Sequence, residues 1–343
     1  MKRFIDHKMF RLPRTVKMPL KYWAFAGISI TNWCSAACPQ CYMCCDPQKN
    51  HWMEVDQALD LWDQLERFNP QGCRIHITGG EPFGDFDRLL TLCEQARARG
   101  LGNLQKVETN GYWATDLDII KRRLTALDRT GMEKLAISAD PFHQLFVPIE
   151  QVRFLVRIAE EILGADRVQV RWRDWLDTGF DPENLAQVKP IAADWIVEKR
   201  DRVNGRAAEC LADTMPRKQV DEFAGRPCKQ GLLLGKHVHI SSDGEIIPGV
   251  CSGVSLGNVN RNSVADIWTD LFFNWQNRPA LSMLSNKGAH GLYEYAKTLG
   301  FIADEKGYCT TCHLCWEVRK FLADKSLFAD EIAPAWIYNK VGS

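Results

Sequence analysis

The segment of residues 28–42 decides the fold, and it reads Ile28-Ser29-Ile30-Thr31-Asn32-Trp33-Cys34-Ser35-Ala36-Ala37-Cys38-Pro39-Gln40-Cys41-Tyr42. Its apolar isoleucines alternate with a serine and a threonine, a pattern that predicts a β-strand. Three cysteines follow, with three residues between the first two and two residues between the last two. We therefore expect these cysteines on the loop that leaves the carboxyl end of the strand.

Three thiolates on one short loop indicate an iron–sulfur site. Cys34, Cys38 and Cys41 can hold three corners of a four-iron cube, and the fourth iron is then left without a protein ligand. An iron with a vacant position is a place where a small molecule can bind. The thirteen cysteines of the chain support metal binding, because an odd number in clusters is a poor disulfide framework.

Length and charge exclude several classes of protein. The chain has 343 residues, of which 45% are hydrophobic, so one large domain and a smaller one can each bury a core. Lys plus Arg and Asp plus Glu are both 43, and this zero net charge argues against a nucleic-acid binder or a polybasic membrane anchor. The basic N-terminus is not followed by a cleavage site of small residues, and no apolar run reaches membrane-spanning length. We predict a cytoplasmic protein that does not bind membranes.

Strands and helices alternate from Ala24 to about Ala208, which predicts a parallel α/β sheet. After the first strand, further strands are expected at Arg74–Thr78, Gln105–Thr109, Lys134–Ser138 and Arg167–Trp172, and a looser helix near Pro182–Val188 leads to a candidate sixth strand at Trp195–Glu198. Ligands of such folds gather at the carboxyl ends of the strands. The polar and glycine-rich segments of this chain fall at those ends, so we expect them on one rim: Cys34–Cys41, Gly79–Pro82, Asn110-Gly111, Asp140 and Arg171.

The pattern changes after Ala208, and we place a domain boundary around 208–225. Short strands, glycines and cysteines follow, with Asp243-Gly244 as a hairpin turn and a helix expected at Val264–Trp275. A second cysteine group lies in this part of the chain: Cys228, Cys251, Cys309, Cys312 and Cys315.

Two motifs together resemble those of the radical S-adenosylmethionine (SAM) superfamily. They are Cys34-x3-Cys38-x2-Cys41 after the first strand and Gly79-Gly80-Glu81-Pro82 after the second, and the resemblance covers residues 24–208 behind an extension of residues 1–23. It implies a partial (β/α)6 barrel. It also implies that the three cysteines hold a [4Fe–4S] cluster whose open iron chelates the amino and carboxylate groups of SAM.

The same resemblance implies the contacts of SAM with the protein. Gly79, Gly80 and Glu81 would bind the methionine amino group through backbone carbonyls and the Glu81 carboxylate, with glycine permitting close approach. The strand-end residues Asn110, Ser138 and Arg171 would contact the ribose and the methionine carboxylate, although Arg171 also fits a solvated surface charge. The chain departs from the family at Gln40, where an aromatic residue is usual, and Tyr42 follows the third cysteine instead. Cys44 and Cys45 fall outside the motif, and we expect them to be structural.

Asp140 and His143 follow the fourth strand in the segment Asp140-Pro141-Phe142-His143. Their position at the rim suits contact with SAM or substrate, or proton transfer. The alternative is a helix-capping aspartate and a loop histidine without a catalytic role.

Residues 209–343 resemble the auxiliary-cluster domains called SPASM and, in a shorter form, twitch. A full SPASM domain carries seven cysteines, and this segment has five beyond the isolated Cys210, so we expect one auxiliary [4Fe–4S] cluster. Its ligands would be Cys228, Cys251 and two or three of the late group Cys309, Cys312 and Cys315. The alternative is a structural zinc site, since Cys309-x2-Cys312 with His313 nearby has zinc spacing.

The resemblance implies cleavage of SAM to a 5′-deoxyadenosyl radical that abstracts hydrogen from an unactivated carbon. The auxiliary cluster would accept the remaining electron or bind the substrate, and flavodoxin or ferredoxin would supply the reducing electron. We expect oxidative maturation, by crosslinking or epimerisation, of a ribosomally made peptide. The first alternative is a small-molecule natural-product precursor as substrate. A second is a non-catalytic metal-binding partner module, against which the Gly79–Glu81 motif argues.

Overall fold

The structure, a computed structural model, describes residues 20–102, 104–179, 190–191, 194 and 202–338. The helix expected near Pro182–Val188 and the sixth strand expected at Trp195–Glu198 lie outside these residues. None of the helices within them is both long enough and apolar enough to cross a membrane.

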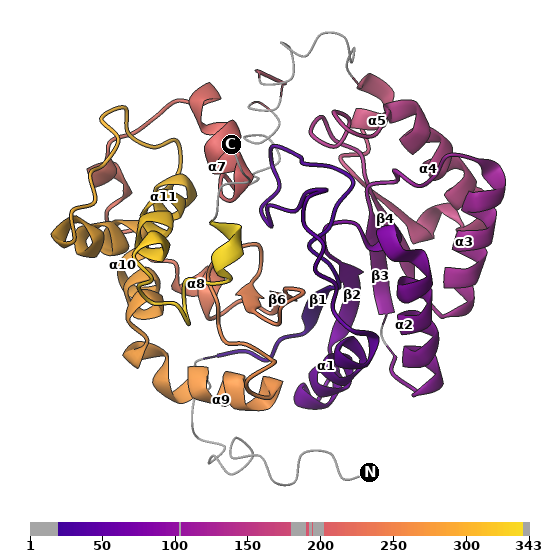
Figure 1. Cartoon of the computed structure of the whole chain (residues 1–343), viewed down its shortest axis with the longest axis horizontal. Coiled ribbons are helices and arrows are strands. Elements are labelled where there is room, and N and C mark those ends of the chain that lie inside the picture. Colours follow the sequence, from indigo (N-terminus) through magenta and orange to yellow (C-terminus); the bar gives the residue numbers. More distant parts are fainter. Residues whose placement is uncertain (1–19, 103, 180–189, 192–193, 195–201, 339–343) are drawn as a thin grey trace.

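The N-terminal part alternates strands and helices, as the sequence predicts (Figure 1). Its strands are β1 (Phe25–Ser29), β2 (Arg74–Thr78), β3 (Leu104–Thr109), β4 (Lys134–Ser138) and β5 (Val168–Arg171). The helices between them are α1 (Val55–Phe68), α2 (Phe86–Ala98), α3 (Leu117–Arg129) and α4 (Ile149–Leu163), with short 3-10 turns η2 (Pro82–Asp85) and η3 (Ala165–Arg167) and the short helix α5 (Trp175–Thr178).

The strands β1 to β5 pair in parallel and in sequence order. Four of the five residues of β1 and of β2 are buried, because helices cover the outer face and the sheet curves around its inner face. The carboxyl ends of the parallel strands therefore meet at one rim, where the chain continues into the loops that carry the candidate site residues. The expected mixed α/β class with a mostly parallel sheet is confirmed.

The C-terminal part extends the same sheet. Strand β6 (His237–Ile240) pairs in parallel with β1, and β7 (Ile246–Pro248) pairs with β6 in antiparallel orientation, so the strand order is β5-β4-β3-β2-β1-β6-β7. The hairpin expected around Asp243-Gly244 is thus present, but it also completes the hydrogen bonding of β1. That long-range pairing cannot be read from local sequence patterns.

Helices of the C-terminal part pack beside this hairpin (Figure 1). The longer ones are α9 (Val264–Asn274), α10 (Pro279–Thr298) and α11 (Thr311–Asp324); the short elements are α7 (Arg206–Cys210), η5 (Ala212–Thr214), η6 (Val220–Phe223), α8 (Lys229–Leu232), η7 (Trp275–Asn277) and η8 (Ala335–Ile337). Helix α11 begins where the Thr310 side chain accepts a hydrogen bond from the His313 amide. Cys312 and Cys315 therefore lie on its first turns.

Candidate active site

The loop after β1 brings the three motif cysteines to one cavity. Cys34, Cys38 and Cys41 all line it, together with Gly79 and Gly80 from the loop after β2. The loop is held in shape by its own backbone, since the Cys41 amide donates to the Cys38 carbonyl at 3.0 Å and the Cys34 amide to the Asp46 carbonyl at 3.2 Å. The rim predicted from the sequence is therefore where the cysteines lie.

The arrangement of the thiols suits a cluster better than a single ion. A tetrahedral zinc ion with Zn–S bonds of about 2.3 Å needs sulfurs about 3.8 Å apart. Among the described residues, the group of His, Cys, Asp and Glu side chains close enough to hold a metal ion contains no cysteine. A four-iron cube spaces its thiolates more widely, with one on each of three corners, and Cys34, Cys38 and Cys41 line one cavity.

Arg206 holds the cysteine loop from the C-terminal side. Its guanidinium donates to the carbonyls of Cys38 and Cys45, both at 3.0 Å, and lies 3.4 Å from the Asp46 carboxylate. Gly205 makes this contact possible, because its φ is 61° and a Cβ there would lie 2.6 Å from the Tyr42 carbonyl oxygen. Both residues lie at the end of the segment 24–208 and were not among the site residues expected from the sequence.

Cys44 and Cys45 differ in their relation to the cavity. Cys44 is buried with its backbone at a positive φ of 52°, while Cys45 lines the cavity beside Cys41. A hydrogen bond from Cys45, helped by the charge of Arg206, lowers the pKa of Cys41, so this thiol readily becomes a thiolate. Cys45 thus supports a motif cysteine, a role that its position outside the motif did not indicate.

The glycine turn after β2 packs directly on the cysteine loop. The Gly80 amide donates to the Thr31 carbonyl and the Glu81 amide to the Trp33 carbonyl, both at 2.8 Å. A Cβ at Gly80 would lie 1.9 Å from the Trp33 carbonyl oxygen, so only glycine fits there. The two motifs therefore form one structural unit.

The Glu81 carboxylate accepts hydrogen bonds from other groups of the protein. It is fully buried and accepts hydrogen bonds from the Phe83 amide at 3.1 Å, the Asn110 amide at 2.6 Å and the Thr109 hydroxyl at 2.9 Å. Burial raises its pKa to about 7. Gly79, Gly80 and Pro82 line the cavity, whereas Glu81 is not among the described residues that do. Its carboxylate hydrogen-bonds Thr109 and Asn110 at the end of β3. The family resemblance implies instead that this carboxylate contacts the amino group of SAM.

Asn110 lies between the two motifs. Its side-chain amide donates to the Ser35 hydroxyl at 3.0 Å and to the Cys34 sulfur at 3.6 Å, and it lines the cavity. Asn110 therefore lies directly after the end of β3, as predicted, and its side-chain amide contacts the cysteine loop.

Asp140 and His143 form a buried pair at the end of β4. The His143 ring nitrogen Nδ1 lies 2.7 Å from the Asp140 carboxylate, which also accepts the backbone amide of His143. Burial lowers the pKa of a histidine, but the charges of Asp140 and Cys38 outweigh it and raise the pKa of His143 well above its usual value. His143 lines the cavity and hydrogen-bonds Cys38, so it is more than a loop histidine.

Ser138 and Arg171 also line the cavity, as do residues that sequence analysis did not single out. Among the latter are Thr78 and Glu108, which share a hydrogen bond of 2.8 Å. Glu108 lines the cavity from the last position but one of β3, and a carboxylate near the end of a strand was the available signal. The C-terminal part contributes further lining residues, which only the tertiary fold could reveal: Arg202, Asn204 and Val250.

Four of the five late cysteines gather at a second place. Burial and the proximity of Cys315, Cys251 and Cys312 raise the pKa of Cys228 to about 12. Cys309 instead has its sulfur 3.3 Å from the Nδ1 atom of His313. Cys309 is not among the thiols that raise the pKa of Cys228, although it lines a cavity together with Cys312, so Cys228, Cys251, Cys312 and Cys315 are the ligand set that we favour.

A buried cation accompanies these four thiols. Arg319 is 1% exposed, and within the described residues it forms no ion pair with a carboxylate. Burial lowers the pKa of a guanidinium, but Tyr338, Cys315 and Cys251 outweigh this effect and the pKa of Arg319 is raised. A buried charge needs a counter-charge, and thiolates holding an iron–sulfur cluster supply one.

Two family models match the chain. Residues 27–130 match a 4Fe-4S single cluster domain, and residues 228–316 match SPASM, an iron-sulfur cluster-binding domain. These matches cover the cysteine loop and the four late cysteines. The chain thus carries a [4Fe–4S] cluster in its N-terminal domain and an auxiliary iron–sulfur cluster in its C-terminal domain. Both matches agree with the resemblance of the chain to radical SAM proteins with a SPASM domain.

No curated protein matches the chain significantly. Solved structures with a similar fold include BtrN in complex with AdoMet and 2-DOIA, at 15% identity and a TM-score of 0.48, covering 78% of this chain and 89% of that one. Streptococcus suis SuiB bound to precursor peptide SuiA has 15% identity and a TM-score of 0.37, with coverages of 92% and 76%. Native anSMEcpe with bound AdoMet and Cp18Cys peptide has 14% identity and a TM-score of 0.35, with coverages of 87% and 95%.

Proposed function

We propose that this enzyme binds SAM in the cavity at the carboxyl ends of β1 to β5 and uses it to oxidise a peptide. One observation carries the proposal: the three motif cysteines, the glycine turn and the strand-end polar residues line a single cavity. A protein that only stored a cluster would not need the glycine turn pressed against the cysteine loop.

Cys34, Cys38 and Cys41 would hold the [4Fe–4S] cluster. When bound, the reduced cluster supplies the electron that splits SAM into methionine and a 5′-deoxyadenosyl radical. The backbone carbonyls of Gly79 and Gly80 lie on the cavity wall and would receive the amino group of SAM. Glu81 holds that backbone in place through its hydrogen bonds to Thr109 and Asn110 at the end of β3.

The remaining strand ends would orient SAM and the substrate. Asn110 fixes the cysteine loop and presents its amide edge to the cavity. His143, oriented by Asp140, lies beside Cys38, where its positive charge offsets that of the thiolate. Ser138 and Arg171 would contact the ribose and the carboxylate of SAM.

Cys228, Cys251, Cys312 and Cys315 would hold the auxiliary cluster, with Arg319 as its buried counter-charge. Cys251 follows directly on Val250, which lines the cavity, so the auxiliary site adjoins the substrate space. This adjacency supports the proposal of a second electron carrier next to the reaction site.

A peptide is the substrate that we favour, and its oxidative maturation by crosslinking or epimerisation is the reaction. The SPASM match supports this choice, because the resemblance associates that domain mostly with ribosomally made peptides. The cavity also offers charges of both signs, in Glu108 on one side and Arg171 and Arg202 on the other. A flavodoxin or ferredoxin is the proposed electron donor, and the cytoplasm is the proposed location.

The proposal is tested by anaerobic reconstitution of the full chain with iron and sulfide, followed by SAM and dithionite. We expect 5′-deoxyadenosine, measured by mass spectrometry, from the wild type. Cys34→Ala should abolish it, and Cys210→Ala, at an exposed cysteine outside both cysteine sets, should leave it unchanged. Equal product from wild type and Cys34→Ala would refute the SAM chemistry.

The substrate class needs a separate experiment. Candidate precursor peptides encoded near the gene are incubated with the active enzyme in D₂O. The product is examined for the loss of two hydrogens, as in a crosslink, and for deuterium at an α-carbon, as in an epimerisation. Oxidation of a small natural-product precursor, with no change in any peptide, would overturn the peptide assignment and leave SAM cleavage intact.

A further inference from the structure

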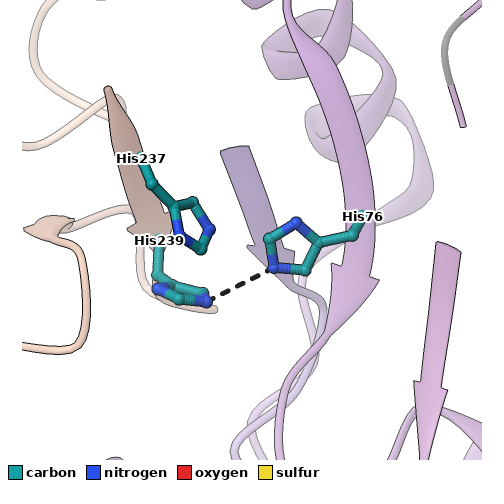
Figure 2. Close-up of side chains that lie close together, drawn as sticks. All are labelled: His76, His237 and His239. Atoms are coloured by element: carbon teal, nitrogen blue, oxygen red, sulfur yellow. Dashed lines mark hydrogen bonds between the residues drawn. The ribbon is translucent and has the colours of Figure 1, made fainter. Parts of the chain in front are cut away.

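Three histidines from two distant parts of the chain meet inside the sheet. His76 lies on β2, and His237 and His239 lie on β6 (Figure 2). One ring nitrogen from each falls within 4.8 Å of the other two. His76 and His239 are buried and His237 is half-buried. Neither the cysteine motifs nor the proposed function accounts for this cluster.

The sheet register and one glycine bring the rings together. Gly27 on β1 pairs with His76 on one side and with His239 on the other, so the three residues form one row across adjacent strands. A Cβ at Gly27 would lie 2.4 Å from atoms of both imidazoles. The absence of a side chain at Gly27 therefore allows the rings from β2 and β6 to meet above β1.

The nitrogen atoms are arranged as ligands. The Nδ1 atom of His239 lies 2.5 Å from the Gly249 carbonyl oxygen, so Nδ1 carries the proton and Nε2 presents its lone pair. That Nε2 atom lies 3.3 Å from Nε2 of His76. The Nε2 atom of His237 is also buried without a hydrogen-bond partner in the described part of the chain, whereas the unpartnered Nδ1 of His76 is not the nitrogen that faces His239. Such nitrogens are costly unless something binds them.

The spacing agrees with a tetrahedral ion. Zn–N bonds of about 2.0–2.1 Å place two ligand nitrogens about 3.3–3.4 Å apart. The Nε2 atoms of His76 and His239 are separated by 3.3 Å, and the third nitrogen is within 4.8 Å. A shift of His237 by about 1.5 Å would therefore complete three ligands at bonding distance.

We propose that His76, His237 and His239 bind a divalent transition-metal ion of the zinc type. Its fourth position is open to water, and the Glu108 carboxylate, 3.9 Å from Nε2 of His76, is near enough to accept a hydrogen bond from that water. The ion joins β2, in the segment that matches the 4Fe-4S domain, to β6, in the segment that matches SPASM. It thereby fastens the two domains to each other across β1.

The test uses the full chain with its cysteines already loaded with iron and sulfide, so that added zinc meets only the remaining sites. The protein is exposed to Zn²⁺ alone, freed of excess metal and analysed for zinc and iron. We expect about one zinc ion per chain, with X-ray absorption showing nitrogen ligands at about 2.0–2.1 Å and no sulfur at about 2.3 Å. Zinc bound through sulfur, or no zinc retained by the wild type, would overturn the proposal.

Variants then assign the ligands. His76→Gln and His239→Gln should lose the zinc and keep the iron, while His290→Gln, at a half-buried histidine on α10, should keep both. Zinc should also raise the thermal midpoint of the wild type and leave that of His239→Gln unchanged. Full zinc occupancy in both ligand variants would contradict the assignment. If either variant does not fold, the ligand distances in the wild type still decide the question.

Discussion

A single methyl group at Gly27 is predicted to disrupt the centre of the sheet. In Gly27→Ala the new Cβ would lie 2.4 Å from Cδ2 of His239 and 2.4 Å from Nε2 of His76. Carbon atoms in normal contact are about 3.5–4.0 Å apart, so both rings would have to move by about 1 Å or more. They cannot move freely, because His239 is held by the Gly249 carbonyl and both rings are buried.

The size of the effect follows from the cost of overpacking. An extra methyl group in a well-packed core typically costs about 1–3 kcal/mol. In domains of 150–250 residues 1 kcal/mol shifts the thermal midpoint by about 2–4 °C, and the shift is smaller in a longer chain, so we expect a decrease of a few degrees and at most about 12 °C. The same displacement of the rings should abolish zinc binding.

Thermal unfolding of the full chain, followed by circular dichroism in the presence of a chelator, measures the decrease. Gly102→Ala is the matched control, since a Cβ at Gly102 meets no atom within 4 Å and its φ is not positive. Combining Gly27→Ala with His76→Ala should cost less than the sum of the two single changes, because removing one ring makes room for the methyl group. A midpoint for Gly27→Ala equal to that of Gly102→Ala would refute the reasoning.

Three further predictions concern the cluster sites. Cys312→Ser should reduce the iron content from about eight per chain to about four, whereas Cys309→Ser should keep the full content. Arg206→Gln should lower cluster occupancy and 5′-deoxyadenosine formation severalfold, because it weakens the guanidinium contacts to the carbonyls of Cys38 and Cys45. The control is Arg217→Gln, which should change neither quantity because the partners of Arg217 lie outside the cysteine loop. Burial raises the folded-state pKa of Glu81 from 4.5 to about 7, so the free energy of unfolding falls as pH rises between these two values. Thermal midpoints measured from pH 5.5 to 8 should therefore decrease less in Glu81→Gln than in the wild type.

Local patterns predicted the N-terminal elements well. The expected strands at Arg74–Thr78 and Lys134–Ser138 agree with β2 and β4 residue for residue, and those at Gln105–Thr109 and Arg167–Trp172 differ from β3 and β5 by one residue at an end. Strand β1 spans Phe25–Ser29 and stops before the expected Ile30 and Thr31. These strands are buried runs bounded by helices, so their periodicity is a direct consequence of their position in the sheet. The rim of candidate residues followed from the same logic, because parallel strands share one carboxyl edge.

Features that depend on contacts between distant segments could not be predicted from the sequence. The row formed by His76, Gly27 and His239 needs the parallel pairing of β1 with β6, which joins residues more than two hundred positions apart. The hydrogen bond from Arg206 to the Cys38 carbonyl likewise joins residues that are far apart in the sequence. Glu81 shows a different limit, since a motif indicates that a carboxylate is present but not the direction in which it points.

The position of β6 also bears on how the two clusters are organised. Strand β6 occupies the edge of β1 that would otherwise be exposed, and β7 leads through Gly249 to Cys251. Above this hairpin, Tyr42 of the cysteine loop packs on His239 with ring centroids 5.7 Å apart. Without the hairpin, β1 would be an edge strand with unpaired backbone groups, and β6 covers that edge. The auxiliary domain is therefore a structural part of the sheet, and the distance between the two cluster sites is fixed by strand pairing, not by a flexible linker.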